Sequence, residues 1–244
     1  MGRRTTSGYR FGVAIVAAAL LTFTPIPVAS QALTYPDSVL ADGATGYWRL
    51  GDAAGTSAAD SAGSATASYV GSPALGAPGL IDDPDTAVIF DGVDDAVHLP
   101  NSTAMNQGGP YATKSIELWF SANEVATRQT LYEQGSVQRG LNIYLEGGQL
   151  YAGAYNTTDN GAGTPWGPVF VSASITAGVN HHVVFTLDAP GDALRLYLDG
   201  TEVASGSEIG PLHNHGRSAI GAQWSWAHYH TGANQGDVNH FNGA

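Results

Sequence analysis

Short segments in which apolar and polar residues alternate recur after residue 33 and constrain the fold more than any other feature. The clearest are SIELWFS (115–121), LNIYLE (141–146), HHVVFTLD (181–188) and LRLYLDG (194–200). Successive side chains of a β-strand point to opposite faces, so such alternation predicts strands with one buried face. No segment after residue 33 repeats apolar residues with a helical period. Many short strands separated by turn residues indicate an all-β sandwich or barrel.

The alternation also predicts which side chains face the core. The side chains expected to point inward are Leu118, Phe120, Phe185, Leu196 and Leu198. Those expected on the opposite faces are Trp119, Tyr144 and Tyr197.

Turn-forming pairs of residues join several of these strands. Asp199-Gly200 and Gly147-Gly148 each separate two alternating runs by two residues, which is the spacing of a tight hairpin. Asp91-Gly92 opens the turn between AVIF and AVHL, which we also expect to be a hairpin.

The first 32 residues have the pattern of a secretory signal peptide. Arg3, Arg4 and Arg10 precede a 14-residue apolar run, FGVAIVAAALLTFT, that is short for a membrane span. Small residues follow, with cleavage expected after Ala32 or after Ser30. We therefore expect a bacterial protein that is secreted or displayed at the cell surface, with no membrane insertion.

The remaining chain, residues 33–244, is strongly acidic. The whole chain has nine basic and 21 acidic residues; removing three arginines with the signal leaves six against 21, a net charge of −15. Such a charge disfavours nucleic acid and anionic lipid as partners. The chain has no cysteine, so a single domain of this size must rely on a large core instead of disulfides.

Several motifs in this order resemble those of the laminin-G-like, concanavalin A-like jelly-roll family of bacterial exported proteins. They are GYWRLGDAAGTSAADSAG, AVIFDGVDDAVHLP, SIELWFS, HHVVFTLD, LRLYLDGTEVASG and IGA. The resemblance covers about residues 35–243. It implies a two-sheet antiparallel β-sandwich (jelly roll) whose relatives bind glycans, proteins or Ca²⁺. It also implies further domains in the same polypeptide, because such domains are modules of larger surface proteins.

The resemblance extends to the last residues, HFNGA (240–244). In the family, the FNG step begins a closing strand that continues as an apolar run. We therefore expect a C-terminally truncated domain whose closing C-terminal strand is missing, with that strand belonging beside GYWRL (46–50).

Three carboxylates, Asp91, Asp94 and Asp95, lie within five positions and allow three interpretations. A turn needs only Asx contacts. A Ca²⁺ site needs six to eight oxygens, more than this segment supplies, so other loops would have to contribute. The acids available in other loops are Asp52, Asp60, Asp82, Asp83 and Asp85. Catalysis is disfavoured, because this chain lacks the E-x-D-x-x-E pattern that glycosidases of the family carry on one strand. We expect a turn, with structural Ca²⁺ as the alternative cofactor.

The tail has the highest density of aromatic and histidine residues. The candidate ligand-binding residues are Trp224, Trp226, His228, Tyr229 and His230. Aromatic faces stack on the C–H surfaces of sugars, and imidazoles supply hydrogen bonds. Packing of these rings under a loop is the alternative. A metal held by His228 with His230, or by His213 with His215, is a third.

A second aromatic set lies on the faces opposite the core: Trp119, Tyr144, Tyr151, Tyr155 and Tyr197. These rings would line a glycan groove if the outer sheet faces form a concave surface. Strands also favour such residues on half-exposed faces without a ligand.

The sequence therefore predicts a non-catalytic carbohydrate- or ligand-binding module of an exported surface protein, with a glycan or a cell-surface protein as partner. A structural or adhesive protein-interaction module without a small ligand is the alternative, followed by a glycoside hydrolase on the same fold.

Overall fold

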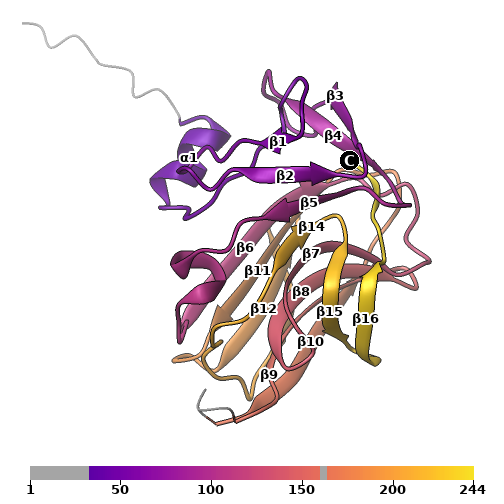
Figure 1. The fold of residues 1–244 in the computed structure, drawn as a ribbon. Coiled ribbons are helices and arrows are strands. Elements are labelled where there is room, and N and C mark those ends of the chain that lie inside the picture. The colour runs from indigo at the N-terminus through magenta and orange to yellow at the C-terminus, as the bar shows by residue number, and fades with distance from the viewer. Residues whose placement is uncertain (1–32, 160–163) are drawn as a thin grey trace, which may run out of the picture.

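The computed structural model describes residues 33–159 and 164–244 (Figure 1). The predicted signal peptide lies outside these residues. The helices are α1 (Tyr35–Ala41) and the single-turn π-helix η1 (Thr103–Gln107). The first strands are β1 (Ser57–Ala58), β2 (Ala67–Val70), β3 (Ala74–Pro78), β4 (Thr86–Asp91), β5 (Ala96–Leu99), β6 (Thr113–Phe120), β7 (Gln129–Gly135), β8 (Arg139–Glu146) and β9 (Gln149–Asn156). They are followed by β10 (Trp166–Ser174), β11 (His181–Asp188), β12 (Ala193–Leu198), β13 (Thr201–Gly206), β14 (Ser218–Ile220), β15 (Gln223–Tyr229), β16 (Gly232–Val238) and β17 (Asn242–Gly243).

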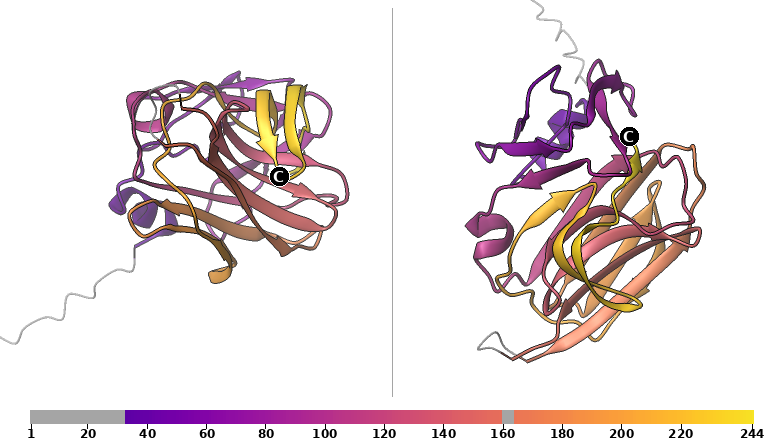
Figure 2. Two further views of the ribbon diagram at one scale, coloured as in Figure 1. Left: turned by 90° about the horizontal axis from the view of Figure 1, so that it is seen from below. Right: turned by 45° about the vertical axis from the view of Figure 1, so that its right-hand side comes forward.

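Two antiparallel sheets form the body of the sandwich. The larger sheet has the strand order β1-β2-β5-β14-β7-β8-β9-β10, and the smaller has the order β13-β12-β11-β6. Two additions complete the fold: the hairpin β15-β16 and the three-stranded sheet β17-β4-β3. The hairpin lies against the side of the larger sheet that faces away from the smaller one (Figures 1 and 2). The expected jelly-roll sandwich is confirmed.

One apolar core joins the inner faces of the two main sheets. Leu141, Ile143 and Leu145 of β8 belong to the same buried cluster as Phe185 of β11 and Leu196 of β12. Burial removes each of these side chains from water and supplies about 1.5–3 kcal/mol per residue. A core of this extent explains how the domain folds without disulfides.

The predicted strand register is confirmed. Phe120, Phe185 and Leu196 are buried, and Leu118 and Leu198 pack against the same cluster. The chain turns at Asp199 and Gly200 with φ of 51° and 79°, the positive values that a two-residue hairpin requires. Gly147 and Gly148, between β8 and β9, have φ of 61° and 77°. Both predicted hairpins are therefore present.

The third predicted hairpin is wrong. β4 pairs with β3 and β17, whereas β5 pairs with β2 and β14, so residues 91–96 cross between two sheets. The turn itself is present as predicted: the Val93 amide donates to Asp91 Oδ1 at 2.8 Å, which is a local Asx contact. Strand pairing is not local, and the sequence motif carried no information about it.

The last residues of the chain pair with β4. Asn242 and Gly243 form β17 and pair with Asp91 and Phe90. In the segment 46–50, beside which the closing strand is expected, Trp48 makes an isolated bridge to Asp60. The last residues therefore lie between β4 and the end of β6.

Candidate functional site

The hairpin β15-β16 is fastened to the larger sheet by two tyrosines of that sheet. The His228 amide donates to the Tyr155 hydroxyl at 3.0 Å, and the His230 amide donates to the Tyr144 hydroxyl at 3.1 Å. Asn142 Nδ2 donates to the His228 carbonyl at 2.9 Å. These bonds satisfy backbone groups of β15 that have no other strand on that side, so the hairpin has a defined position on the sheet.

Tyr229 points from the hairpin into the sheet and is fully buried. Its ring meets Tyr144 edge-on, with centroids 4.7 Å apart, and the Arg128 guanidinium lies 4.5 Å from its centroid. Its hydroxyl lies 2.9 Å from Thr130 Oγ1. Tyr229, one of the five candidate ligand residues, therefore packs the hairpin in place and has no surface to offer a ligand.

The other four candidates occupy every second position along β15 and the residue after it: Trp224, Trp226, His228 and His230. They are half-buried or exposed, whereas Ala227 and Tyr229 between them are buried. Trp224 stacks on His98 of β5 with ring centroids 3.7 Å apart, and Arg217 lies 5.0 Å from its centroid. His230 stacks on Tyr151 at 4.2 Å. Trp226 is 41% exposed. The structure therefore brings together a row of rings in which Trp226 and His230 are exposed and Trp224 and His228 are half-buried.

The second aromatic set does not form an open groove. Tyr144 and Tyr155 are fully buried beneath the hairpin, and Tyr151 stacks on Tyr144 with centroids 5.1 Å apart. Trp119 lies on the smaller sheet, stacked on His182 at 4.7 Å. The hairpin covers Tyr144 and Tyr155, and Trp119 and Tyr197 lie on the other main sheet, so these rings do not line one groove.

A buried carboxyl group, which no sequence motif indicated, lies beneath the hairpin. Glu133 of β7 is 1% exposed, and its Oε1 accepts no hydrogen bond within the described residues. Burial raises its pKa to about 8, against the opposing effects of the Trp224 amide, which donates to the carboxyl, and the Arg217 charge. Glu133 is therefore protonated at neutral pH, and the hairpin separates it from solvent.

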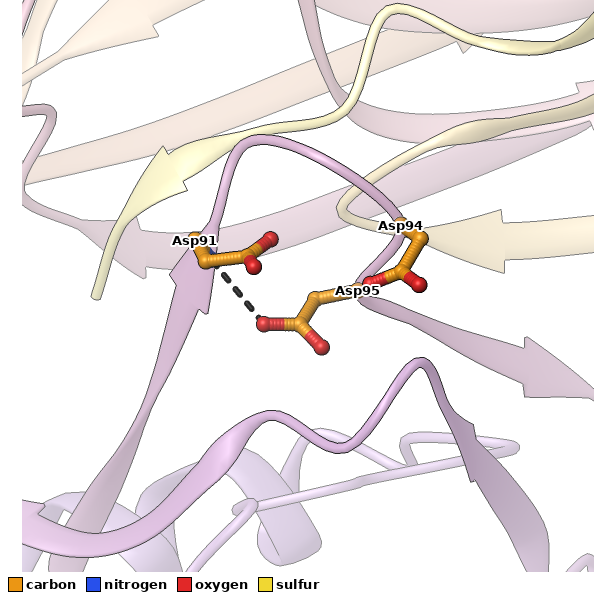
Figure 3. Close-up of side chains that lie close together, drawn as sticks. All are labelled: Asp91, Asp94 and Asp95. Carbon is orange, nitrogen blue, oxygen red and sulfur yellow. Dashed lines mark hydrogen bonds between the residues drawn. The ribbon is translucent and has the colours of Figure 1, made fainter.

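The acidic turn begins at Asp91, the last residue of β4, and groups three carboxylates (Figure 3). One oxygen from each of Asp91, Asp94 and Asp95 lies within 4.8 Å of the others, the only group of three or more metal-ligating side chains within residues 33–159 and 164–244. The Asp91 amide donates to Asp95 Oδ2 at 3.0 Å, and burial raises the pKa of Asp95. The turn therefore gathers three carboxylates, and hydrogen bonds within the turn help to fix its shape.

Four of the five acids in the other loops have protein partners, and the fifth, Asp82, is exposed. Asp60 accepts the amides of Tyr47, Ala62 and Ala65, and these bonds lower its pKa against the effect of burial. Three further acids are also partnered: Arg49 reaches Asp83 at 2.5 Å and Asp85 at 2.9 Å, and Asp52 accepts the Tyr69 hydroxyl at 2.9 Å. These contacts do not build a second acidic cluster.

Three of the four histidines proposed as metal ligands have hydrogen-bond partners of their own. His230 Nδ1 lies 2.6 Å from the Tyr144 hydroxyl, whereas His228 Nδ1 lies 3.3 Å from the Val137 carbonyl. His215 Nε2 lies 2.6 Å from Gln134 Nε2, and burial lowers the pKa of His215 to about 4. These imidazoles thus hold loops and the hairpin in place.

The sequence of the sandwich matches a known family. The model of the concanavalin A-like lectin/glucanases superfamily matches residues 91–244, and this chain belongs to that family. No curated protein matches the sequence.

Solved structures share the fold at low sequence identity. The botulinum neurotoxin serotype G binding domain is 11% identical with a TM-score of 0.52, and 75% of this chain covers 42% of that one. The binding domain of botulinum neurotoxin DC, in complex with SialylT, is 12% identical with a TM-score of 0.52, covering 73% of this chain and 40% of that one.

A structure of botulinum neurotoxin type C, described for its interaction with two ganglioside molecules, is 12% identical with a TM-score of 0.53, covering 72% of this chain and 42% of that one. This chain therefore spans less than half the length of these similar structures. Two of these structures are named as binding domains, and the family description names both lectins and glucanases.

Proposed function

We propose that this protein is a non-catalytic carbohydrate-binding module of an exported protein, and that it binds glycans through the row of rings on β15. The family, whose description names lectins, supports this class of ligand, as does the fold's similarity to structures described with ganglioside molecules or SialylT. The single observation that carries the proposal is the exposure of Trp226 on a hairpin that the sheet holds rigidly. No helix in the described part of the chain is long and apolar enough to cross a membrane.

The chemistry of the row suits a sugar better than a charged partner. An exposed indole presents a flat apolar face to the C–H surface of a pyranose. His228 and His230 follow it at two-residue spacing, with successive residues of the row about 6–7 Å apart along a strand, and imidazoles both donate and accept hydrogen bonds. Because Trp224 and His230 are already stacked on the sheet, little side-chain freedom is lost when a ligand binds.

Hydrolysis is not part of the proposal. Glycoside hydrolysis needs two carboxyl groups facing the scissile bond. Glu133 is a protonated acid on this face, but the hairpin covers it, so it does not face a ligand bound to the row. The protein should therefore bind sugars without cleaving them.

The test is a glycan array probed with the purified protein, followed by affinity measurements on its best ligand. We expect Trp226→Ala to abolish binding while leaving the thermal midpoint almost unchanged. Val179→Ala, an exposed apolar residue before β11, is the matched control and should retain binding. Loss of folding stability in Trp226→Ala would mean that the ring packs the hairpin. Binding to cell-surface proteins but to no glycan would favour the adhesive alternative.

We also propose that the acidic turn holds a structural Ca²⁺. The three carboxylates of Asp91, Asp94 and Asp95 are hard oxygen ligands, and water and carbonyl oxygens would complete the shell. Ca²⁺ should raise the thermal midpoint of the wild type and have no effect on Asp94→Asn. Equal responses of both proteins to Ca²⁺ and Mg²⁺ would show that no specific site exists.

A further inference from the structure

Arg217 is an arginine to which the described side chains offer no carboxylate partner, in a chain that is rich in carboxylates. Residues 33–244 carry six basic side chains against 21 acidic ones. Three of the six, Arg49, Arg128 and Arg195, each pair with a carboxylate. Arg217 makes no such pair within the described side chains, although it is exposed. Its positive charge is therefore available to a ligand.

Arg217 lies at one end of the row of rings on β15, and its position there is fixed. Its guanidinium carbon lies 5.0 Å from the centroid of the Trp224 ring, and its Nη1 donates to the Trp224 carbonyl at 3.4 Å. The Arg217 carbonyl accepts the Gly135 amide at 3.0 Å, which anchors this backbone to the end of β7. Because Trp224 is itself stacked on His98, the guanidinium is held beside an immobilised ring.

Most of the hydrogen-bonding capacity of the Arg217 side chain is unused within the described residues. A guanidinium has five N–H groups in a planar fork. The bond from Nη1 to the Trp224 carbonyl uses one of them. The remaining donors match the two oxygens of a carboxylate, which an arginine binds through two parallel N–H···O bonds.

The buried acid beneath the hairpin does not neutralise this arginine. Burial raises the pKa of Glu133 to about 8, so its carboxyl is uncharged at neutral pH although the Arg217 charge acts on it. The row itself consists of indoles and imidazoles and contributes no acid. An anionic group bound beside Trp224 would therefore meet a positive charge there, whereas the acidic chain as a whole disfavours anions.

We propose that the row of rings binds acidic glycans and that Arg217 binds the carboxylate of one of their sugars beside Trp224. This inference rests on the proposed function, because it assigns the class of sugar that the same row takes. An indole stacks on the C–H face of a sugar whether or not the sugar is charged. Trp226 therefore supplies affinity for glycans in general, and Arg217 supplies the preference for an acid.

Two pairs of probes test the preference: sialyllactose with lactose, and trigalacturonate with its methyl ester. Only the first member of each pair carries a free carboxylate. We expect the wild type to bind at least one acidic probe about tenfold more tightly than its uncharged counterpart, as expected for one charge-assisted contact. The pair that shows this difference identifies the sugar acid. Titration calorimetry gives both affinities.

Three variants assign the preference to Arg217. Arg217→Gln should weaken binding of the acidic probe about tenfold and leave that of the uncharged counterpart unchanged. Arg217→Lys keeps the charge but loses the planar fork, so its affinity for the acid should be intermediate. Arg195→Gln makes the same change of charge on β12 of the smaller sheet and should leave both affinities unchanged. Asp237→Asn, at the position paired with Trp224 in the strand register, removes a negative charge from the hairpin and should strengthen binding of the acid.

The outcomes separate this inference from the proposed function. Equal binding of acidic and uncharged probes by the wild type would overturn the inference and leave glycan binding through Trp226 in place. Equal loss of both probes in Arg217→Gln would overturn it too, because the arginine would then only hold the hairpin. Binding to no probe and to no glycan on the array would contradict the proposed function and this inference together.

Discussion

Replacing Glu133 by Gln should change how stability depends on pH. The carboxyl is 1% exposed beneath the β15-β16 hairpin, and burial raises its pKa from 4.5 to about 8. In the unfolded chain the same group releases its proton near pH 4.5. Between these two values the folded protein binds one more proton than the unfolded chain. The free energy of unfolding therefore falls as pH rises from about 4.5 to 8, and this contribution is constant above that range.

The magnitude follows from the two pKa values. Each unit of difference is worth about 1.4 kcal/mol, so a rise from 4.5 to about 8 corresponds to about 5 kcal/mol as an upper limit. Gln has the shape of the protonated acid but cannot ionise. We expect Glu133→Gln to match the wild type near pH 4.5 and to exceed its stability by several kcal/mol at pH 8.5.

The assay is urea unfolding followed by tryptophan fluorescence between pH 4.5 and 9. His215 works in the opposite direction, because burial lowers its pKa to about 4 and its contribution is lost as pH falls from 6.5 toward 4. Both proteins contain His215, so its contribution cancels when the free energy of unfolding of the wild type is subtracted from that of Glu133→Gln. Glu202→Gln, an exposed carboxyl on β13, controls for net charge. Parallel curves for wild type and Glu133→Gln across the range would refute the reasoning.

Three further substitutions test the packing. Phe185→Ala in the core should lower the free energy of unfolding by about 3–5 kcal/mol in urea titrations; a neutral result would contradict the core assignment. Gly153→Ala on β9 should cost about 1–3 kcal/mol by calorimetry, because its Cβ would overlap the Phe170 ring. Tyr155→Phe removes the acceptor of the His228 amide, so that amide should exchange faster and stability should fall by about 1–2 kcal/mol; unchanged exchange would mean that the bond does not hold the hairpin.

The sandwich was predictable because its signals are local. Alternation in residues 181–188 and 194–200 reflects one buried and one exposed face, and Asp199-Gly200 favours the positive φ that the turn needs. Glu133 was missed because its strand, β7, is buried throughout. A strand covered on both faces loses its alternation, and its polar residues then give no sign of burial.

The sequence predicted which residues make up the candidate site, but not how the fold arranges them. The tail residues do gather, and Trp226 is exposed as a ligand site requires. The fold of the tail into a hairpin over the larger sheet depends on contacts such as Tyr144 with Tyr229, 85 positions apart in the chain. The same long-range pairing placed β4 and β5 in different sheets, which residues 91–95 alone did not reveal.

An NMR titration of the indole N–H groups tests the central claim most directly. The chain has five tryptophans, so each indole signal can be assigned by substitution and followed as a glycan is added. The account predicts saturable shifts of Trp226, and smaller ones of Trp224, with Trp48, Trp119 and Trp166 unchanged. Shifts confined to those three, or no shift with any glycan that the protein retains, would contradict glycan binding at the β15 hairpin.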